Sequence, residues 1–176
     1  MYIITATYIG KLILLKKNNS DGYDVHQTIS DLGTGIQTCD MSSDHQYAAY
    51  HDLTSLRVYK FNSGTTQFDP FQTISVTDAT SVSLSGDGEY LCVGSPTNDI
   101  KIFKNDGSTY SLWKTINMAT STVYFVKAYL QDSIEYLIVP DRDTTDTSVT
   151  ATKVYKFNSA TEEFDLDSEK VFTGYN

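Results

Sequence analysis

One phrase recurs four times along this chain. An aromatic residue opens it, and Gln or Lys followed by Thr and Ile closes it. Three clear copies occupy residues 23–29, 68–74 and 110–116, and a stretched copy runs from 164 to 172. A recurrence every roughly 40 to 50 residues indicates a fold built from copies of one supersecondary unit. The sequence therefore predicts a repeat architecture.

The repeated unit is clearest over residues 76–117. Four strand-like segments occur there in order, at 81–85, 90–95, 100–104 and 110–116, and turn residues such as Gly86-Asp-Gly-Glu89 separate them. The composition agrees, because 41 of the 176 residues are Ser or Thr and 21 are Tyr or Phe, whereas Ala and Glu together number 13. Strand formers dominate and helix formers are scarce. Four antiparallel strands per repeat are typical of a propeller blade.

We therefore predict an all-β, β-propeller-type repeat array of about four four-stranded antiparallel blades, forming a single domain over residues 1–176. The predicted blades are residues 1–30, 31–75, 76–117 and 118–173. A polar insertion, Asp141 to Ser148, is expected as a surface loop of the last blade. The core should include side chains packed between blades, namely Val82, Leu84, Leu91, Ile100 and Ile102.

The first blade is expected to lack its innermost strand. Tyr2-Ile-Ile-Thr5 aligns with the second strand at Tyr90-Leu-Cys-Val93, and both lie ten residues before a third strand. A second strand without its inner neighbour exposes unpaired backbone groups that can pair with another chain. The residues predicted at this interface are Tyr2, Ile3, Ile4, Thr5, Val171, Phe172, Thr173 and Tyr175. The expected partner is a protein, either another copy or the rest of a larger propeller.

The segments Ser81-Val-Ser-Leu-Ser-Gly-Asp-Gly-Glu-Tyr-Leu-Cys-Val-Gly-Ser95 and Ile100-Lys-Ile-Phe-Lys104 resemble a blade of the WD40-like and integrin-α-like propeller families. That resemblance implies a propeller fold. The chain departs from both patterns. No Gly-His pair precedes a blade and no Trp-Asp pair closes a third strand, and the Asp-x-Asp-x-Asp-Gly calcium loop of the integrin type is absent.

The charge balance narrows the choice of partner. A net charge of −9 and a sequence pI near 4.6 argue against nucleic acid, which would need a basic surface. The longest apolar run, Leu12 to Leu15, is too short to insert into a membrane. No leader peptide is apparent after Met1. The sequon Asn18-Asn-Ser20 is a candidate glycosylation site, so an extracellular location is favoured over a cytoplasmic one, although the compartment stays open.

The sequence offers few groups for catalysis, and we predict no catalytic residue and no cofactor. The histidines His26, His45 and His51 have no second ligand at metal-binding spacing, so they are expected to pack or to lie at the surface. Asp40 and Asp44 flank a hairpin near the expected central channel, although turn chemistry explains Asp44.

Two further groups of residues could carry chemistry. The candidate Ca²⁺ ligands Asp141, Asp143 and Asp146 do not have the spacing of an EF-hand loop, so no metal site is predicted there. Cys39 and Cys92 are expected to be free thiols within strands, with an inter-blade bridge left open as the alternative.

These features lead to the hypothesis of a non-enzymatic propeller scaffold, a module for self-assembly or protein interaction. The first alternative is an extracellular glycan-binding or adhesion module. The second is a propeller hydrolase, of the lactonase type, with its active site at the mouth of the channel.

Overall fold

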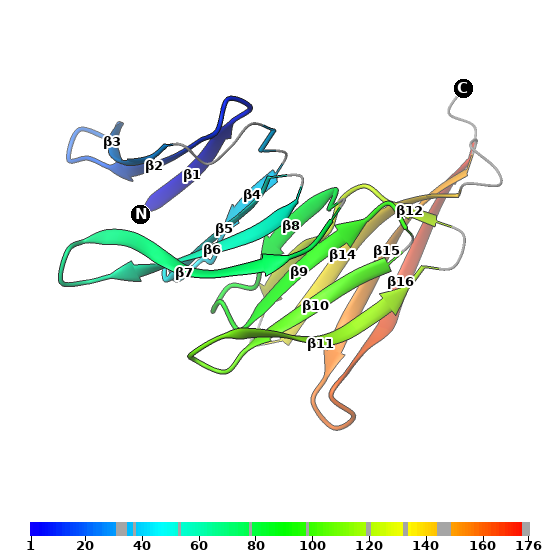
Figure 1. Cartoon of the computed structure of the whole chain (residues 1–176). Helices are drawn as coiled ribbons and strands as arrows, with labels where there is room; N and C mark the ends of the chain where they lie inside the picture. The colour runs from blue at the N-terminus through cyan, green and yellow to red at the C-terminus, as the bar shows by residue number, and fades with distance from the viewer. Residues whose placement is uncertain are drawn as a thin grey trace.

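The computed structural model describes residues 1–30, 35–36, 38–52, 54–77, 79–97, 99–118, 121–131, 134–143 and 149–173. All the regular elements in these ranges are strands. No helix suited to crossing a membrane occurs in them. The strands form four antiparallel sheets, as the repeats predict. Figure 1 shows the sheets in a row, with the N-terminal and C-terminal sheets at opposite ends.

Blade 1 is a three-stranded sheet, and blades 2 and 3 have four strands each. The strands of blade 1 are β1 (Tyr2–Thr7), β2 (Lys11–Lys17) and β3 (Tyr23–Ile29). Those of blade 2 are β4 (Thr38–Met41), β5 (Tyr47–His51), β6 (Ser55–Asn62) and β7 (Gln67–Ser75). Those of blade 3 are β8 (Ser81–Leu84), β9 (Tyr90–Ser95), β10 (Asp99–Asn105) and β11 (Tyr110–Asn117).

Blade 4 differs because its inner strand is broken in two. Its strands are β12 (Ser121–Val123), β13 (Lys127–Gln131), β14 (Ile134–Asp143), β15 (Val149–Asn158) and β16 (Glu163–Thr173). Both β12 and β13 pair with β14. The sequence aligns residues 122–126 with the inner strand at 81–85 and so predicts one continuous strand there. That prediction was wrong, since the chain leaves the sheet at residues 124–126.

Two further boundaries differ from the sequence prediction. Asp141 to Asp143 belong to β14 and pair with β12, so they are not part of a loop, and residues 144–148 lie outside the described residues. Val171 to Thr173 lie where the repeat pattern predicts the inner strand of a further blade, but they do not form one. They end β16, the outermost strand, and pair with Val149 to Ala151. Long antiparallel pairing with β15 therefore holds both segments in blade 4.

The core consists of three apolar clusters, one between each pair of neighbouring blades. The first lies between blades 1 and 2 and includes Leu12, Leu14, Tyr50 and Phe68. The second joins blades 2 and 3, and the third joins blades 3 and 4. The five side chains predicted for the core are 0–4% exposed, which confirms that prediction.

The middle strands are covered on both faces. Every residue of β5 and of β9 is buried, because a blade on either side covers each of these sheets. The turn before β9 also fits this packing. Gly88 has a φ of +71°, a conformation that favours glycine, and an added Cβ would collide with the ring of Tyr47 in blade 2.

Candidate active site on the inner strands

The inner strands of neighbouring blades are linked through side chains. The N–H of Val82 on β8 donates to Oγ1 of Thr38 on β4, at 3.2 Å. One blade further, the N–H of Val126 donates to Oγ of Ser81, at 2.9 Å. A side chain of each inner strand thus satisfies a backbone donor of the next. The structure repeats this contact, so Thr38 and Ser81 occupy equivalent positions.

The same kind of contact, from a backbone N–H to a side chain of the preceding blade, recurs two residues further along each inner strand. The N–H of Leu84 donates to Oδ2 of Asp40, at 2.9 Å, and the N–H of Ala128 donates to Oγ of Ser83, at 3.1 Å. Asp40 and Ser83 are therefore equivalent. Because Ala128 takes the place of Leu84, the residue before it, Lys127, takes the place of Ser83 in blade 4.

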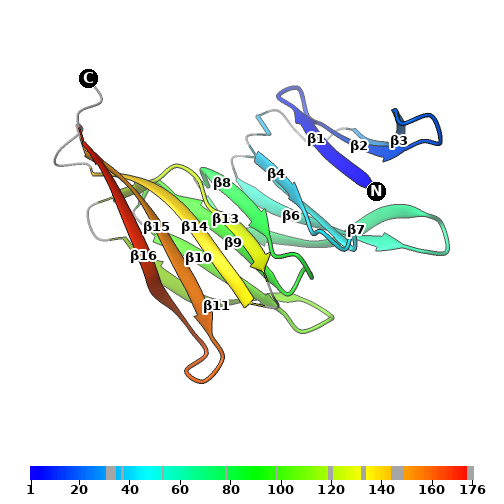
Figure 2. The same ribbon diagram turned by 180° about the vertical axis from the view of Figure 1, so that it is seen from behind.

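Of these three equivalent side chains, Ser83 and Lys127 both contact Asp40. The hydroxyl of Ser83 donates to Oδ2 of Asp40, at 2.7 Å, and Nζ of Lys127 lies 2.7 Å from the same oxygen. The side chain of Asp40 is 18% exposed and that of Lys127 is 42% exposed, whereas Ser83 is fully buried. Figure 2 shows that the three strands β4, β8 and β13 lie along the same side of the molecule.

The arrangement leaves one carboxylate oxygen available. All three donors converge on Oδ2 of Asp40, and no donor from the described residues reaches Oδ1. The ammonium group of Lys127 is partly open to solvent beside it. The hydroxyl of Ser83 already serves as both donor and acceptor, since it donates to Asp40 and accepts from the N–H of Ala128. The site thus offers a carboxylate acceptor next to a cation, with a serine that positions the carboxylate.

Exposed aromatic side chains flank Lys127 in the sequence. Tyr124 and Phe125 occupy the break between β12 and β13 and are 57% and 49% exposed. Tyr129 is 48% exposed and lies two residues after Lys127, on the same face of the strand. Such rings offer an apolar surface against which the ring of a small polar ligand can pack.

The other residues considered from sequence do not join this site. His26 contacts the carbonyl of Thr66, at 2.6 Å, and His51 is buried with Nε2 at 2.9 Å from the carbonyl of Val76. The ring of His45 packs 5.7 Å from that of Tyr2.

Asp44 and Asn18 both act in turns. Oδ1 of Asp44 accepts from the hydroxyl of Ser42 and, at 2.9 Å, from the N–H of Gln46, as expected from the sequence. Oδ1 of Asn18 accepts from the backbone of the same turn, and its Nδ2 donates to Asp24, at 3.1 Å. The amide that a glycan would modify is therefore engaged in the hairpin.

Both cysteines are free thiols. Burial, with a smaller contribution from Asp40, raises the pKa of Cys39 to about 11. Burial also raises the pKa of Cys92, with Glu135 adding to the effect. Neither thiol is ionised at neutral pH, so neither is a ready nucleophile.

The remaining candidates stay predictions. In the described part of the chain no three His, Cys, Asp or Glu side chains converge as metal ligands. Asp146 lies outside the described residues, and so does Tyr175. Tyr2, Ile3, Ile4 and Thr5 lie on β1, which among the described strands pairs with β2 alone, so one edge of β1 has no partner strand there.

Lys127 was missed because the sequence alignment of blade 4 assumed an unbroken inner strand. That alignment makes residue 124, and not residue 127, the equivalent of Ser83 in blade 4. The break at residues 124–126 shifts the register by three positions. Glu135, a buried carboxylate of β14, was also missed, because its equivalents by alignment with the other blades are the more exposed Gln46 and Glu89.

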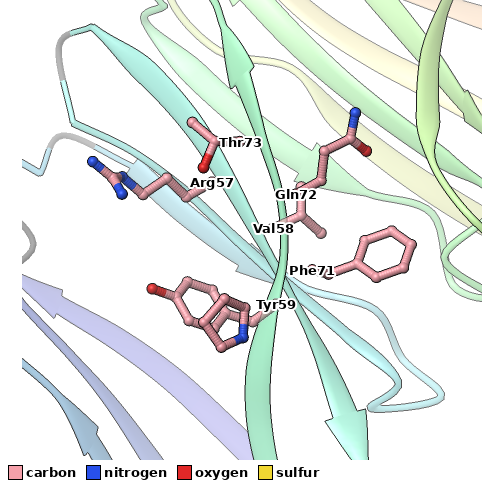
Figure 3. A pocket seen from close by; sticks show the side chains of 7 residues that line it. Arg57, Val58, Tyr59, Phe71, Gln72 and Thr73 are labelled. Carbon is pink, nitrogen blue, oxygen red and sulfur yellow. The ribbon is translucent and has the colours of Figure 1, made fainter.

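A hollow of about 250 Å³ on blade 2 does not form a comparable site. It surrounds the bulge at Val58 and Tyr59, where β6 and β7 lose their regular register. Figure 3 shows Phe71 and Gln72 on one side of the strands and Arg57 and Tyr59 on the other. The lining side chains therefore diverge instead of converging on a ligand.

Comparison with known proteins finds no matching family model and no matching curated protein. The fold does match solved structures. One is the crystal structure of a "putative 6-phosphogluconolactonase" from Bacteroides uniformis, with a TM-score of 0.69 and 13% sequence identity. The match covers 96% of this chain and 54% of the other, so this chain spans about half the length of that protein.

This comparison corrects the functional hypothesis drawn from the sequence. The expectation of a non-enzymatic, self-assembling scaffold was wrong in the light of this neighbour, which is named as an enzyme of the lactonase type. The expectation that the chain is not an enzyme is overturned with it, and the hydrolase alternative is the better supported. The WD40 family is not confirmed. At 13% identity, what the likeness shows is a propeller-type fold of antiparallel sheets.

Proposed function

We propose that this chain belongs to a propeller hydrolase that opens a sugar lactone, with Asp40, Ser83 and Lys127 at the reaction centre. The observation that carries the proposal is the contact of these three side chains at the equivalent position of successive inner strands. The name of the structural neighbour supplies the substrate class. A WD40-like or integrin-α-like ancestry of the blades is a finer proposal that rests on residues 81–104 alone.

The chemistry assigned to each residue follows from its contacts. Oδ1 of Asp40 accepts a proton from a water molecule as that water attacks the lactone carbonyl. The ammonium group of Lys127 stabilises the oxyanion that forms on the carbonyl oxygen. The ring C–O bond then breaks, and the ring oxygen takes the proton from Asp40. The products are those of adding one water to the lactone, an open-chain hydroxy acid.

Ser83 is a positioning residue in this scheme. A serine nucleophile must be reachable by the substrate, whereas Ser83 is fully buried, with its hydroxyl donating to Asp40 and its oxygen accepting from Ala128. The three histidines lie elsewhere, against Thr66, Tyr2 and Val76. Attack by water, with no acyl-enzyme, is therefore the proposed route.

The test is hydrolysis of δ-gluconolactone and of 6-phosphogluconolactone by the purified chain, followed by acid release. Asp40→Asn should lower kcat by about 100-fold or more, the usual contribution of a general base. The matched control is Asp21→Asn, which removes the same charge from a side chain that is 92% exposed, and it should leave the rate unchanged. Wild-type rates equal to buffer, or an unaffected Asp40→Asn variant that is folded by circular dichroism, would overturn the proposal.

A further inference from the structure

A second cavity, of about 260 Å³, lies between blades 3 and 4. It is bordered by the turn between β8 and β9 and by the hairpin between β15 and β16. Four carboxylates line it, those of Asp87, Glu89, Glu135 and Glu162, together with one cation, Lys104. When all five groups are ionised, the lining carries a net charge of −3, four negative charges against one positive.

Two of these carboxylates already have partners. Oδ1 of Asp87 accepts from the hydroxyl of Ser85, at 2.8 Å, and from the N–H of Glu89, at 2.9 Å. Oε1 of Glu89 forms an ion pair with Nζ of Lys104, at 3.3 Å. The carboxylate of Asp87 thus stabilises the turn, and Lys104, the cation of the lining, is paired with Glu89.

Glu135 is different. It is 6% exposed, and neither of its carboxylate oxygens has a hydrogen-bond partner among the described residues. Burial, and then the charges of Asp87 and Glu89, raise its pKa to about 7. A buried carboxylate without donors is costly, so its presence in a cavity points to a ligand that supplies them.

The cavity walls also suit a cation. The rings of Tyr90 and Phe157 line it, with their centroids 5.7 Å apart. The same aromatic cluster already holds an ammonium group, since Nζ of Lys104 lies 5.6 Å from the centroid of Tyr90 and 5.9 Å from that of Trp113. Aromatic faces attract cations and also cover an alkyl chain.

We propose that this cavity binds the primary ammonium group of a small alkylamine, which donates N–H bonds to the two free oxygens of Glu135. A metal ion fits less well, because no three metal-ligating side chains converge in the described part of the chain. A quaternary ammonium group fits less well too, since it has no N–H to donate. Asp40, Ser83 and Lys127 are not among the described residues that line this cavity, so the proposal does not depend on the lactonase proposal.

Binding should depend on pH through Glu135. The groups facing it are Asp87, Glu89, Tyr90, Lys104 and Glu162. Ammonium binding requires the ionised carboxylate, which predominates above pH 7, so raising the pH from 6 to 8 should tighten binding about tenfold. Above pH 8 the affinity should level off.

The experiment is calorimetric titration of the whole chain with n-butylammonium, tetramethylammonium and n-butanol. We expect binding of the first alone. Glu135→Gln, which keeps the shape of the side chain, should weaken binding at least tenfold. The control Glu162→Gln removes the same charge from an exposed lining residue and should change the affinity less than threefold.

Each other outcome contradicts the proposal. No binding of butylammonium would overturn it, as would an equal loss in the two variants, which would mean general attraction to an acidic surface. Equal binding of tetramethylammonium would show that N–H donation is unnecessary. Binding of Ca²⁺ that is lost in Glu135→Gln and competes with the amine would reassign the site to a metal. Thermal denaturation of both variants checks that they fold.

Discussion

At the scale of the residue, one asparagine recurs in the hairpin before every outer strand. The four residues are Asn18, Asn62, Asn105 and Asn158. In each, Oδ1 accepts from the backbone N–H two residues later, at 2.9 to 3.0 Å. In three blades Nδ2 also donates to an aspartate of the outer strand. The side chain mimics a backbone turn and anchors it to the next strand.

We expect Asn62→Ala to lower the free energy of unfolding by about 1–2 kcal/mol, because it removes both contacts of this turn. Asp69, which accepts from Nδ2 of Asn62 at 2.8 Å, should show coupling with it of about 0.5–1 kcal/mol in a double-mutant cycle. Urea denaturation measures both quantities. The control is Ser63→Ala, an exposed change in the same turn, expected within about 0.5 kcal/mol. Additive effects at Asn62 and Asp69 would show that their hydrogen bond adds no stability.

At the scale of the element, the recurring Gln of the sequence phrase joins each outer strand to the next. Gln27 exchanges two hydrogen bonds with the backbone of Phe68, at 2.8 and 3.0 Å. Gln72 does the same with Tyr110, at 2.6 and 2.9 Å. In blade 3 the equivalent residue, Lys114, forms an ion pair with Glu163 instead. The glutamine side chain thus pairs with a backbone N–H and a C=O of the outer strand in the neighbouring blade.

Gln72→Ala should therefore cost about 2–4 kcal/mol, since it leaves one N–H and one C=O of Tyr110 without partners. Gln72→Glu keeps the acceptor but loses the donor, so its free energy of unfolding should fall between those of the wild type and Gln72→Ala. Gln67→Ala, an exposed change on the same strand, serves as the control and should be neutral. Guanidinium denaturation compares the three variants. If Gln72→Ala matched Gln67→Ala, the link between the outer strands would add nothing to stability.

These elements also show what the sequence could predict. The blades, the incomplete first sheet and the buried residues such as Leu91 follow from periodicity, because each repeat buries the same face. The active-site cluster does not follow, since it needs the register of three inner strands and a break at residues 124–126 displaces Lys127. Glu135 could not be found either. Its position in the repeat is also polar, and more exposed, in blades 2 and 3, so the pattern gives no sign that the residue is buried in blade 4.

At the scale of the whole molecule, stability should be divided among the three clusters between blades. Blades 2 and 3 pack on both faces, whereas the described contacts of blades 1 and 4 cover one face each. Proteins built in this way behave as a row of units coupled to their nearest neighbours. Backbone hydrogen exchange should then be slowest in β5 and β9 and faster in β1–β3 and β16.

Two leucines, both fully buried, test this division. Leu14 lies between blades 1 and 2, and Leu91 lies between blades 2 and 3. Each change to Ala should cost about 2–5 kcal/mol, the range for a core leucine. Leu14→Ala should speed hydrogen exchange in β1–β3 and leave β8–β11 unchanged, whereas Leu91→Ala should speed it across both central blades. Mass spectrometry of exchanged peptides distinguishes these patterns. Uniform acceleration in both variants would mean that the four blades unfold as one cooperative unit, with no separate contribution from each cluster.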